Sequence, residues 1–269
     1  MSAYTPLGPT GLLLPVGYMA EIMAIDTPLP TLYYPLDDVG TGSARELMRG
    51  LKGTVIGPAS GGASGPGTGN AFQFSNTPNF ASSGYVLTPT NIAVGIFNNQ
   101  GPWSIEHWFK QTAAQNATQF TTGMWVWAPQ ANLPPLQQPP AATFQPAGYL
   151  NWSGLGPAGA VNGYGGNATT SLVTSAAGFA DGNWHQYVFT YDGGGAAGNL
   201  VLYADGAQVA NAATVGVNTA ETPGGFQIGI SGNNNRGGTF NGNLAHFTVW
   251  NRVLTLAEVT AHFNAMGTH

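Results

Sequence analysis

The chain has 269 residues, of which 43% are hydrophobic and 11% aromatic, enough apolar material for a full core. Only 6% are charged, against about 25% in an average globular protein. Six Lys and Arg residues are too few to neutralise a phosphate backbone or an anionic lipid surface, which excludes nucleic-acid and basic membrane-surface binding. The absence of cysteine excludes disulfides and thiolate metal sites. Because few charges protect poorly against association, we expect a homo-oligomer or assembly subunit, with a soluble monomer as the alternative.

The first thirty residues are predicted to form an N-terminal arm, and residues 31–269 a single β-domain. Tyr18, Met19, Ile22 and Met23 follow helical spacing before two prolines, which predicts one short helix in the arm. This helix either covers one end of the domain or docks on a neighbouring subunit. No Lys or Arg precedes Arg45, and no apolar run approaches the roughly 20 residues of a membrane span, so we expect neither a signal peptide nor a membrane segment.

Short runs with period-two alternation predict an all-β protein. In residues 103–110, for example, Trp103 and Ile105 share one face while Ser104 and Glu106 share the other. Further strands are expected at residues 32–36, 51–57, 71–74, 85–87, 171–173, 184–191, 199–204, 207–210, 226–230 and 243–250. The glycine-rich residues 57–70 are expected to form a loop, and residues 111–167 look irregular. About twelve strands with little helix predict two stacked antiparallel sheets.

Two local sequence patterns predict a turn and a helix start in the C-terminal third of the chain. Asp205-Gly206 lies between two strand-like runs and predicts a two-residue hairpin turn. Thr255 and Glu258 have the spacing of a capping box, in which each side chain bonds the other residue's backbone N–H. A short helix is therefore expected to follow Thr255.

The order of these runs resembles the laminin-G-like, concanavalin A-like jelly-roll family. The matching runs are LYYPLDDVGTGSARELMRGLKGTVIG, AFQFSNTPNF, PWSIEHWFK, DGNWHQYVFTYDG, LYADGAQV and FNGNLAHFTVWNRVLTLAEVTAHF. They are spread over almost the whole chain, and their order is more specific than any single run. The resemblance implies an antiparallel jelly-roll sandwich with a short C-terminal helix and, by default, a binding function.

A subset of this family occurs in minor tail and other virion proteins of bacteriophages that infect actinobacteria. The segments YMAEIMAIDTPLPTLYYPLDD and LAHFTVWNR are similar to that subset. This similarity implies a head-decoration or minor tail protein, made in the host cytoplasm without a leader, in which the arm contacts other virion proteins.

Many relatives bind a structural Ca²⁺, and the resemblance places Asp37 and Asp38 at the first half of that site. At the second half this chain has Ala245 and His246, where acidic residues are common. A hard cation needs several oxygen ligands. The alternative is that Asp37 and Asp38 cap a turn, and no other cofactor is expected.

Catalysis is not expected, because the resemblance supplies no catalytic residues. Glucanases of this general fold carry an E-x-D-x-x-E string, which this chain lacks, and Glu106 is alone on its strand. Glycosidases need two carboxylates. A degenerate glycanase that uses Glu106 remains the third interpretation.

Sugar recognition needs aromatic rings beside short polar side chains. Candidates of both kinds occur in the irregular middle and in the polar loop before the last strand: Trp125, Trp127, Trp152, Tyr164, Asn234, Asn235 and Arg236. The alternative is that the tryptophans belong to the core and the asparagines to a turn. We therefore expect a non-enzymatic virion protein with a lectin-like domain for host glycans, or else a secreted bacterial carbohydrate-binding module or lectin.

Overall fold

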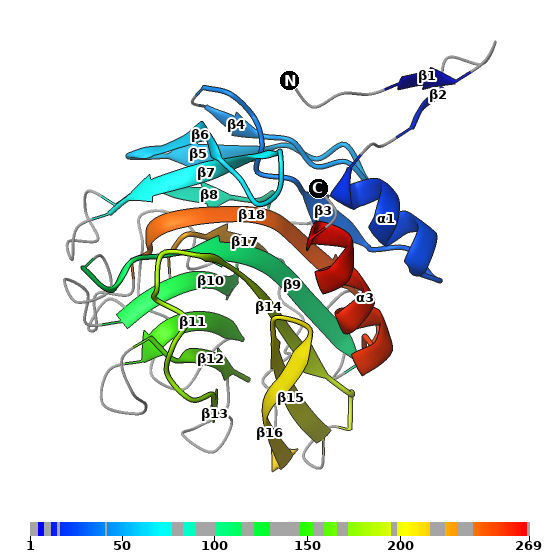
Figure 1. The fold of residues 1–269 in the computed structure, drawn as a ribbon, viewed down its shortest axis with the longest axis vertical. Helices are drawn as coiled ribbons and strands as arrows, with labels where there is room; N and C mark the ends of the chain where they lie inside the picture. The colour runs from blue at the N-terminus through cyan, green and yellow to red at the C-terminus, as the bar shows by residue number, and fades with distance from the viewer. Residues whose placement is uncertain are drawn as a thin grey trace.

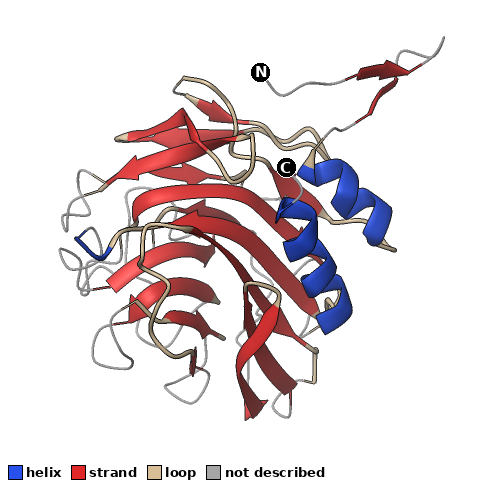
Figure 2. Cartoon of the chain, viewed as in Figure 1, coloured by secondary structure: helices blue, strands red, loops and turns tan. Residues whose placement is uncertain are grey.

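The chain folds into two antiparallel sheets packed face to face (Figure 1). The computed structural model describes residues 5–7, 12–14, 17–40, 42–76, 83–89, 101–114, 121–129, 146–152, 159–165, 172–194, 198–215, 224–230 and 239–267. The predicted all-β sandwich is confirmed, and Figure 2 shows strands throughout, with the two longer helices together on one side. None of the described helices is both long and apolar enough to cross a bilayer.

Sheet 1 has the strand order β13-β12-β11-β10-β17-β8-β5-β4. In chain order its strands are β4 (Ser43–Ala44), β5 (Gly53–Ile56), β8 (Tyr85–Leu87), β10 (Thr121–Pro129), β11 (Ala147–Trp152), β12 (Val161–Tyr164), β13 (Leu172–Thr174) and β17 (Gly224–Ile228).

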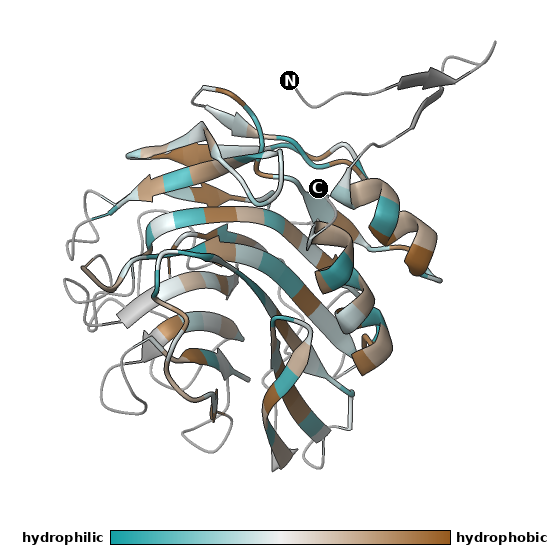
Figure 3. Cartoon of the chain, in the orientation of Figure 1, coloured by the Kyte–Doolittle hydropathy of each residue, from teal (hydrophilic) through white to brown (hydrophobic). Residues whose placement is uncertain are grey.

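Sheet 2 has the order β16-β15-β14-β9-β18-β7-β6, and β3 also pairs with β18. Its strands are β3 (Leu32–Tyr34), β6 (Ala59–Ser64), β7 (Asn70–Ser75), β9 (Trp103–Lys110), β14 (Trp184–Tyr191), β15 (Gly198–Ala204), β16 (Ala207–Val215) and β18 (Asn241–Trp250). Hydrophobic and hydrophilic bands alternate along its strands, as the sequence predicts (Figure 3).

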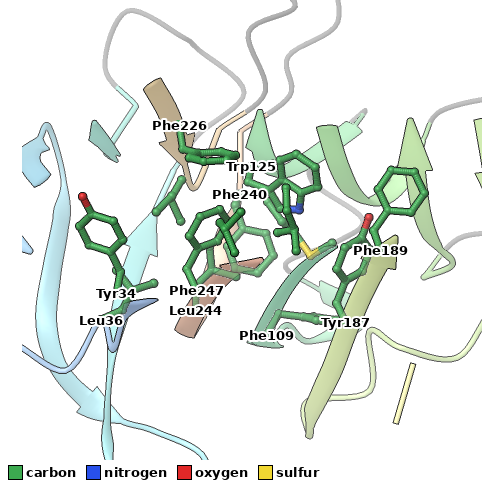
Figure 4. Packing of buried hydrophobic residues seen from close by; sticks show 14 of the residues in the cluster. Tyr34, Leu36, Phe109, Trp125, Tyr187, Phe189, Phe226, Phe240, Leu244 and Phe247 are labelled. Carbon is green, nitrogen blue, oxygen red and sulfur yellow. The ribbon is translucent and has the colours of Figure 1, made fainter. Parts of the chain in front are cut away.

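The main core lies between the sheets. Trp125 and Phe226 of sheet 1 pack against Phe247 of sheet 2, with ring centroids 6.4 and 5.1 Å from that of Phe247 (Figure 4). Backbone register carries one inward-facing row across seven strands of sheet 1: Val55, Val86, Ile228, Trp125, Gly148, Gly163 and Val173. The two glycines leave room for aromatic rings, because a Cβ on Gly148 would lie 2.2 Å from Trp125 Nε1.

The outer face of sheet 2 is covered by two helices, α1 (Tyr18–Ile25) and α3 (Leu256–Gly267). They lie side by side against the sheet, although they come from opposite ends of the chain (Figure 1). The apolar residues between the helices and the sheet form a second cluster, in which the Trp108 and Phe263 rings stack with centroids 5.8 Å apart. This face is therefore occupied by the protein itself.

Both local predictions for the C-terminal third are confirmed. Asp205 and Gly206 have φ values of 50° and 76° and join β15 to β16, as a tight hairpin turn requires. The Thr255 N–H donates to Glu258 Oε2 at 2.7 Å, and the Glu258 N–H donates to Thr255 Oγ1 at 3.3 Å. The capping box therefore begins α3 as the sequence indicated.

Two segments differ from the sequence prediction. The expected loop at residues 57–70 contains β6, which pairs with β7. A Cβ on Gly61 would lie 1.5 Å from the Asp38 carbonyl oxygen, so glycine here serves close backbone packing rather than flexibility. The irregular-looking residues 111–167 contain β10, β11 and β12. Their alternation is hard to read in the sequence because Gly148 and Gly163 occupy inward positions where apolar side chains are expected.

The N-terminal residues form a small sheet of their own. Strand β1 (Thr5–Leu7) pairs with β2 (Leu12–Leu14), with Pro6 opposite Leu13. Figure 1 shows this hairpin standing away from the sandwich beyond α1. The helix expected within residues 18–25 is present and packs on sheet 2.

Candidate functional site

The outer face of sheet 1 carries its own cluster of side chains, separate from the main core. Register places one outward-facing row across seven strands: Thr54, Leu87, Gln227, Val126, Ala147, Tyr164 and Leu172. Tyr149 and Asn162 are paired in the adjacent outward row. Val126, Ala147, Tyr149 and Tyr164 pack together, with Leu172 against them. We call the surroundings of Tyr149, Asn162, Tyr164 and Gln227 the amide face.

Two side-chain oxygens on the amide face have no hydrogen-bond partner. They are Asn162 Oδ1 and Gln227 Oε1, on residues that are 0% and 1% exposed. The Asn162 amide nitrogen donates to the Ala160 carbonyl at 3.0 Å, so this side chain is held in place. An unsatisfied buried acceptor costs roughly 1–3 kcal/mol. The amide face therefore holds two buried acceptors without donors, and the one on Asn162 is fixed in place.

The aromatic residues predicted from the sequence are divided between two places. Trp125 and Trp127 point into the main core, 0% and 3% exposed, and the Trp127 ring lies 5.4 Å from that of Phe226. Neither ring presents a face at the surface, because the alternation of β10 directs both inward. Among the predicted aromatics whose side chains are described, Tyr164 lies on the amide face.

The remaining predicted glycan residues lie outside what the structure describes. Trp152 has its backbone in β11, but its side chain is not described, and neither are Asn234, Asn235 and Arg236. Among the described residues, the exposed large hydrophobic side chains are Leu29, Val39 and Leu256, none of them aromatic.

Sequence reasoning missed Asn162, Gln227 and Tyr149. Each is one polar or aromatic residue in a short strand, and Gln227 alternates with the core residues Phe226 and Ile228. That alternation indicates that the Gln227 side chain points away from the core. Only strand pairing reveals that residues 162 and 227 lie on the same face.

The carboxylates predicted for Ca²⁺ are bound to an arginine. Arg45 Nη2 lies 2.7 Å from Asp37 Oδ1, and Arg45 Nε lies 2.6 Å from Asp38 Oδ1. The backbone N–H of Arg45 also donates to Asp38 Oδ2 at 2.7 Å. His246 instead contacts the Tyr33 hydroxyl, 2.6 Å from its Nδ1. Within the described ranges, no group of three His, Asp or Glu side chains is arranged to hold a metal.

Glu106 belongs to a buried network on the outer face of sheet 2, beneath the helices. Its Oε2 lies 2.8 Å from His262 Nδ1, and its Oε1 accepts from the Tyr18 hydroxyl and from Gln186 Nε2. His262 Nε2 in turn lies 3.2 Å from Asp26 Oδ1. We call Tyr18, Asp26, Glu106 and His262, with Gln186, the helix clasp.

Charge holds the helix clasp together. Burial alone would lower the pKa of His262, but the Glu106 charge and hydrogen bonds to Asp26 and Glu106 raise it to about 10. Burial would likewise raise the pKa of Glu106, and the His262 charge with its hydrogen bonds lowers it instead. His262 and Glu106 are therefore both charged at neutral pH, and Glu106 has no exposed surface from which to act on a substrate.

The comparisons with known proteins agree with this architecture. Residues 80–260 match the laminin G-type model described as the concanavalin A-like lectin/glucanases superfamily. The match covers more than half of the chain, so the protein belongs to this superfamily. No curated protein matches the sequence.

Solved structures share the fold at low sequence identity. Domain 4 of AbnA, a GH43 extracellular arabinanase from Geobacillus stearothermophilus, in complex with arabinotriose, has a TM-score of 0.58 and 15% identity, covering 87% of this chain and 97% of that one. The binding domain of botulinum neurotoxin DC in complex with rat synaptotagmin II has a TM-score of 0.59 and 12% identity, covering 88% and 52%. A complex of the same binding domain with SialylT gives 0.52 and 11%, covering 86% and 52%. The chain spans about half the length of the neurotoxin domains.

Proposed function

We propose that this protein is a non-enzymatic bacteriophage virion component that binds host-surface glycans on the amide face. The observation that carries the binding part is the pair of buried acceptors without partners on the outer face of sheet 1. Membership of a lectin-like superfamily and the arabinotriose complex of a structural neighbour support a carbohydrate ligand.

The environment of Glu106 supports a role without catalysis. Its carboxylate is 0% exposed and ion-paired with His262 beneath two helices. Retaining and inverting glycosidases both need two carboxylates on either side of an accessible bond. A glycanase based on Glu106 would require the helices to leave the sheet.

A virion role is supported by how the two phage-like segments meet. Asp26, from the first segment, accepts from Trp250 Nε1 at 2.8 Å and from Arg252 Nη2 at 2.9 Å, both in the second segment. Strand β3 of the first segment pairs with β18 of the second. The similarity to virion proteins therefore covers one contiguous structural unit rather than two unrelated stretches.

The arm is the proposed attachment to other virion proteins. Hairpin β1–β2 has three residues in each strand and stands apart from the sandwich. A two-stranded hairpin is marginally stable alone in water, so it gains most from a partner protein. Both helices lie on the side opposite the amide face, and α1 belongs to the arm, so the amide face is directed away from the attachment.

A glycan array probed with the purified chain tests the binding function. We expect binding to at least one glycan class and no release of reducing ends from any polysaccharide bound. An array without binding, repeated with host cell-wall material, would contradict the proposal. Reducing ends released by the parent chain would instead support the glycanase.

Deleting residues 1–16 tests the virion role, because this deletion removes the hairpin and keeps α1 with the helix clasp. We expect the shortened chain to keep its melting temperature and glycan binding but to be absent from purified particles. Normal incorporation would contradict the role of the arm. Absence of the intact chain from particles would favour the second candidate, a secreted bacterial carbohydrate-binding module.

A further inference from the structure

The eight strands of sheet 1 contain no ionisable acid or base that is charged near neutral pH. Their sequences are SA, GTVI, YVL, TTGMWVWAP, AGYLNW, VNGY, LVT and GGFQI, without Asp, Glu, Lys, Arg or His. In sheet 2, by contrast, a single strand, β9, already carries both Glu106 and Lys110. A ligand lying on sheet 1 meets amides, phenols and apolar groups, so the sheet supplies no cation to pair with a carboxylate, sulfate or phosphate.

The two unpartnered atoms of the amide face are both acceptors. Asn162 Oδ1 and Gln227 Oε1 are carbonyl oxygens, which accept but never donate. A ligand that satisfies them must present N–H or O–H groups, and an anionic oxygen there would be repelled. Neutral, hydroxyl-rich sugar units meet this requirement.

The two acceptors are too far apart for one sugar ring. Asn162 is on β12 and Gln227 on β17, with β11 and β10 between them. Three spacings between neighbouring strands amount to roughly 14 Å. Tyr149 lies on the intervening strand β11, and Tyr164 lies beside Asn162 on β12, so aromatic rings accompany the stretch that joins the two acceptors.

From these three observations we infer that the amide face binds a neutral, extended oligosaccharide, whose hydroxyls donate to Asn162 at one end and to Gln227 at the other. The inference rests on the proposed glycan-binding function and adds the charge and the length of the ligand. Because both residues are buried, entry of the ligand requires local rearrangement at this face. Association is therefore expected to be slower than the roughly 10⁵–10⁷ M⁻¹s⁻¹ of rigid encounters.

Calorimetric titration of the full chain tests charge and length together. The neutral probes are linear arabino- and gluco-oligosaccharides of one to six units, and the anionic probes are polygalacturonate and sialyllactose. We expect no binding of the monosaccharides, affinity that rises at least tenfold with chain length in one neutral series, and a dissociation constant that changes less than twofold when NaCl is raised tenfold.

The outcomes separate this inference from the proposed function. Tight, salt-sensitive binding of an anionic probe, or equal affinity for monomer and hexamer, would overturn the inference and leave glycan binding in place. Failure of every probe here and of every glycan on the array would overturn both.

A matched pair of variants tests the site itself. Gln227→Met removes the unpartnered acceptor at nearly constant volume, so we expect unchanged or increased thermal stability and an affinity at least tenfold weaker. Gln73→Met changes the same residue type on β7 of sheet 2, where the side chain is exposed, and should leave affinity unchanged. If Gln227→Met folds and binds like the parent chain, the amide face is not the site. Asn162→Leu removes the acceptor at the other end of the amide face and should weaken binding in the same way.

Discussion

The His262 imidazole lies with its Nδ1 2.8 Å from Glu106 Oε2, although the two residues are 156 positions apart in the chain and both side chains are fully buried. This contact joins α3 to β9. Through Tyr18 and Asp26 the same clasp also holds α1. The helices that cover sheet 2 are therefore fixed by charge as well as by apolar packing.

Glu106→Gln is expected to destabilise the fold strongly. The substitution leaves a buried cation with one carboxylate fewer, and breaking a buried ion pair by removing one partner costs about 3–5 kcal/mol. Urea unfolding measures the loss. Glu21→Gln, at an exposed position of the same clasped helix α1, is the control and should change stability by less than about 0.5 kcal/mol. Equal stability of the two variants would mean that the clasp contributes little.

Alkaline pH is expected to weaken the clasp. The His262 pKa is about 10 in the folded chain and about 6.5 in an unfolded one, so the folded state binds the proton more tightly. The stabilisation is complete below about pH 6.5 and is lost as pH rises toward 10. The difference in unfolding free energy between the parent chain and His262→Gln should shrink across that window. A difference that stays constant with pH would show that His262 is neutral.

Acid pH acts through a different histidine. His107 is buried in the main core beside Tyr187, with ring centroids 4.7 Å apart, and neither ring nitrogen has a partner. Burial lowers its pKa to about 3. Because the unfolded chain takes up this proton first, His107 destabilises the fold progressively as pH falls from about 6.5 toward 3.

His107→Leu should remove that acid sensitivity. Replacing an unpartnered buried polar group by an apolar one of similar size is nearly neutral or stabilising, so the variant should be at least as stable as the parent at pH 7. Its advantage should grow at pH 4. Thermal unfolding at both pH values measures this, and a variant that is less stable at pH 4 would contradict the account.

Gly148→Ala tests the packing of sheet 1. The new Cβ would lie 2.2 Å from Trp125 Nε1, and overpacking of this kind costs typically about 1–3 kcal/mol. Gly267→Ala is the control, because a Cβ at that position at the end of α3 meets nothing within 4 Å. Denaturant midpoints should fall for the first variant only. A midpoint unchanged in Gly148→Ala would mean that the Trp125 ring is free to move aside.

Calcium is expected to have little effect on stability. Asp37 and Asp38 are already ion-paired with Arg45 at 2.7 and 2.6 Å, and a cation would have to displace the guanidinium. Melting temperatures with millimolar Ca²⁺ and with a chelator should therefore agree. A rise with Ca²⁺ in the parent chain would restore the metal site; a rise only in Arg45→Leu would confirm that the arginine blocks it.

The candidate site could be predicted from the sequence only in part. Tyr164, one of the predicted glycan residues, lies on the amide face, but Trp125 and Trp127 face the core, because the direction of a side chain depends on which sheet face the strand buries. Asn162 gives no signal of its own, and the alternation around Gln227 indicates only that this residue faces outward. Their common face follows from the pairing of β12, β11, β10 and β17, which spans more than sixty residues of chain and leaves no local pattern.

What the sequence determined alone was local. Alternation in residues 103–110 and 184–191, the Asp205-Gly206 turn and the Thr255–Glu258 capping box each depend on neighbours within a few residues, so backbone geometry and short-range hydrogen bonds suffice to specify them. The tertiary structure decided which sheet face the helices cover, where Glu106 finds its cation and which acceptors share a face. These depend on strand register and on burial far from water, which arise only when distant segments pack together.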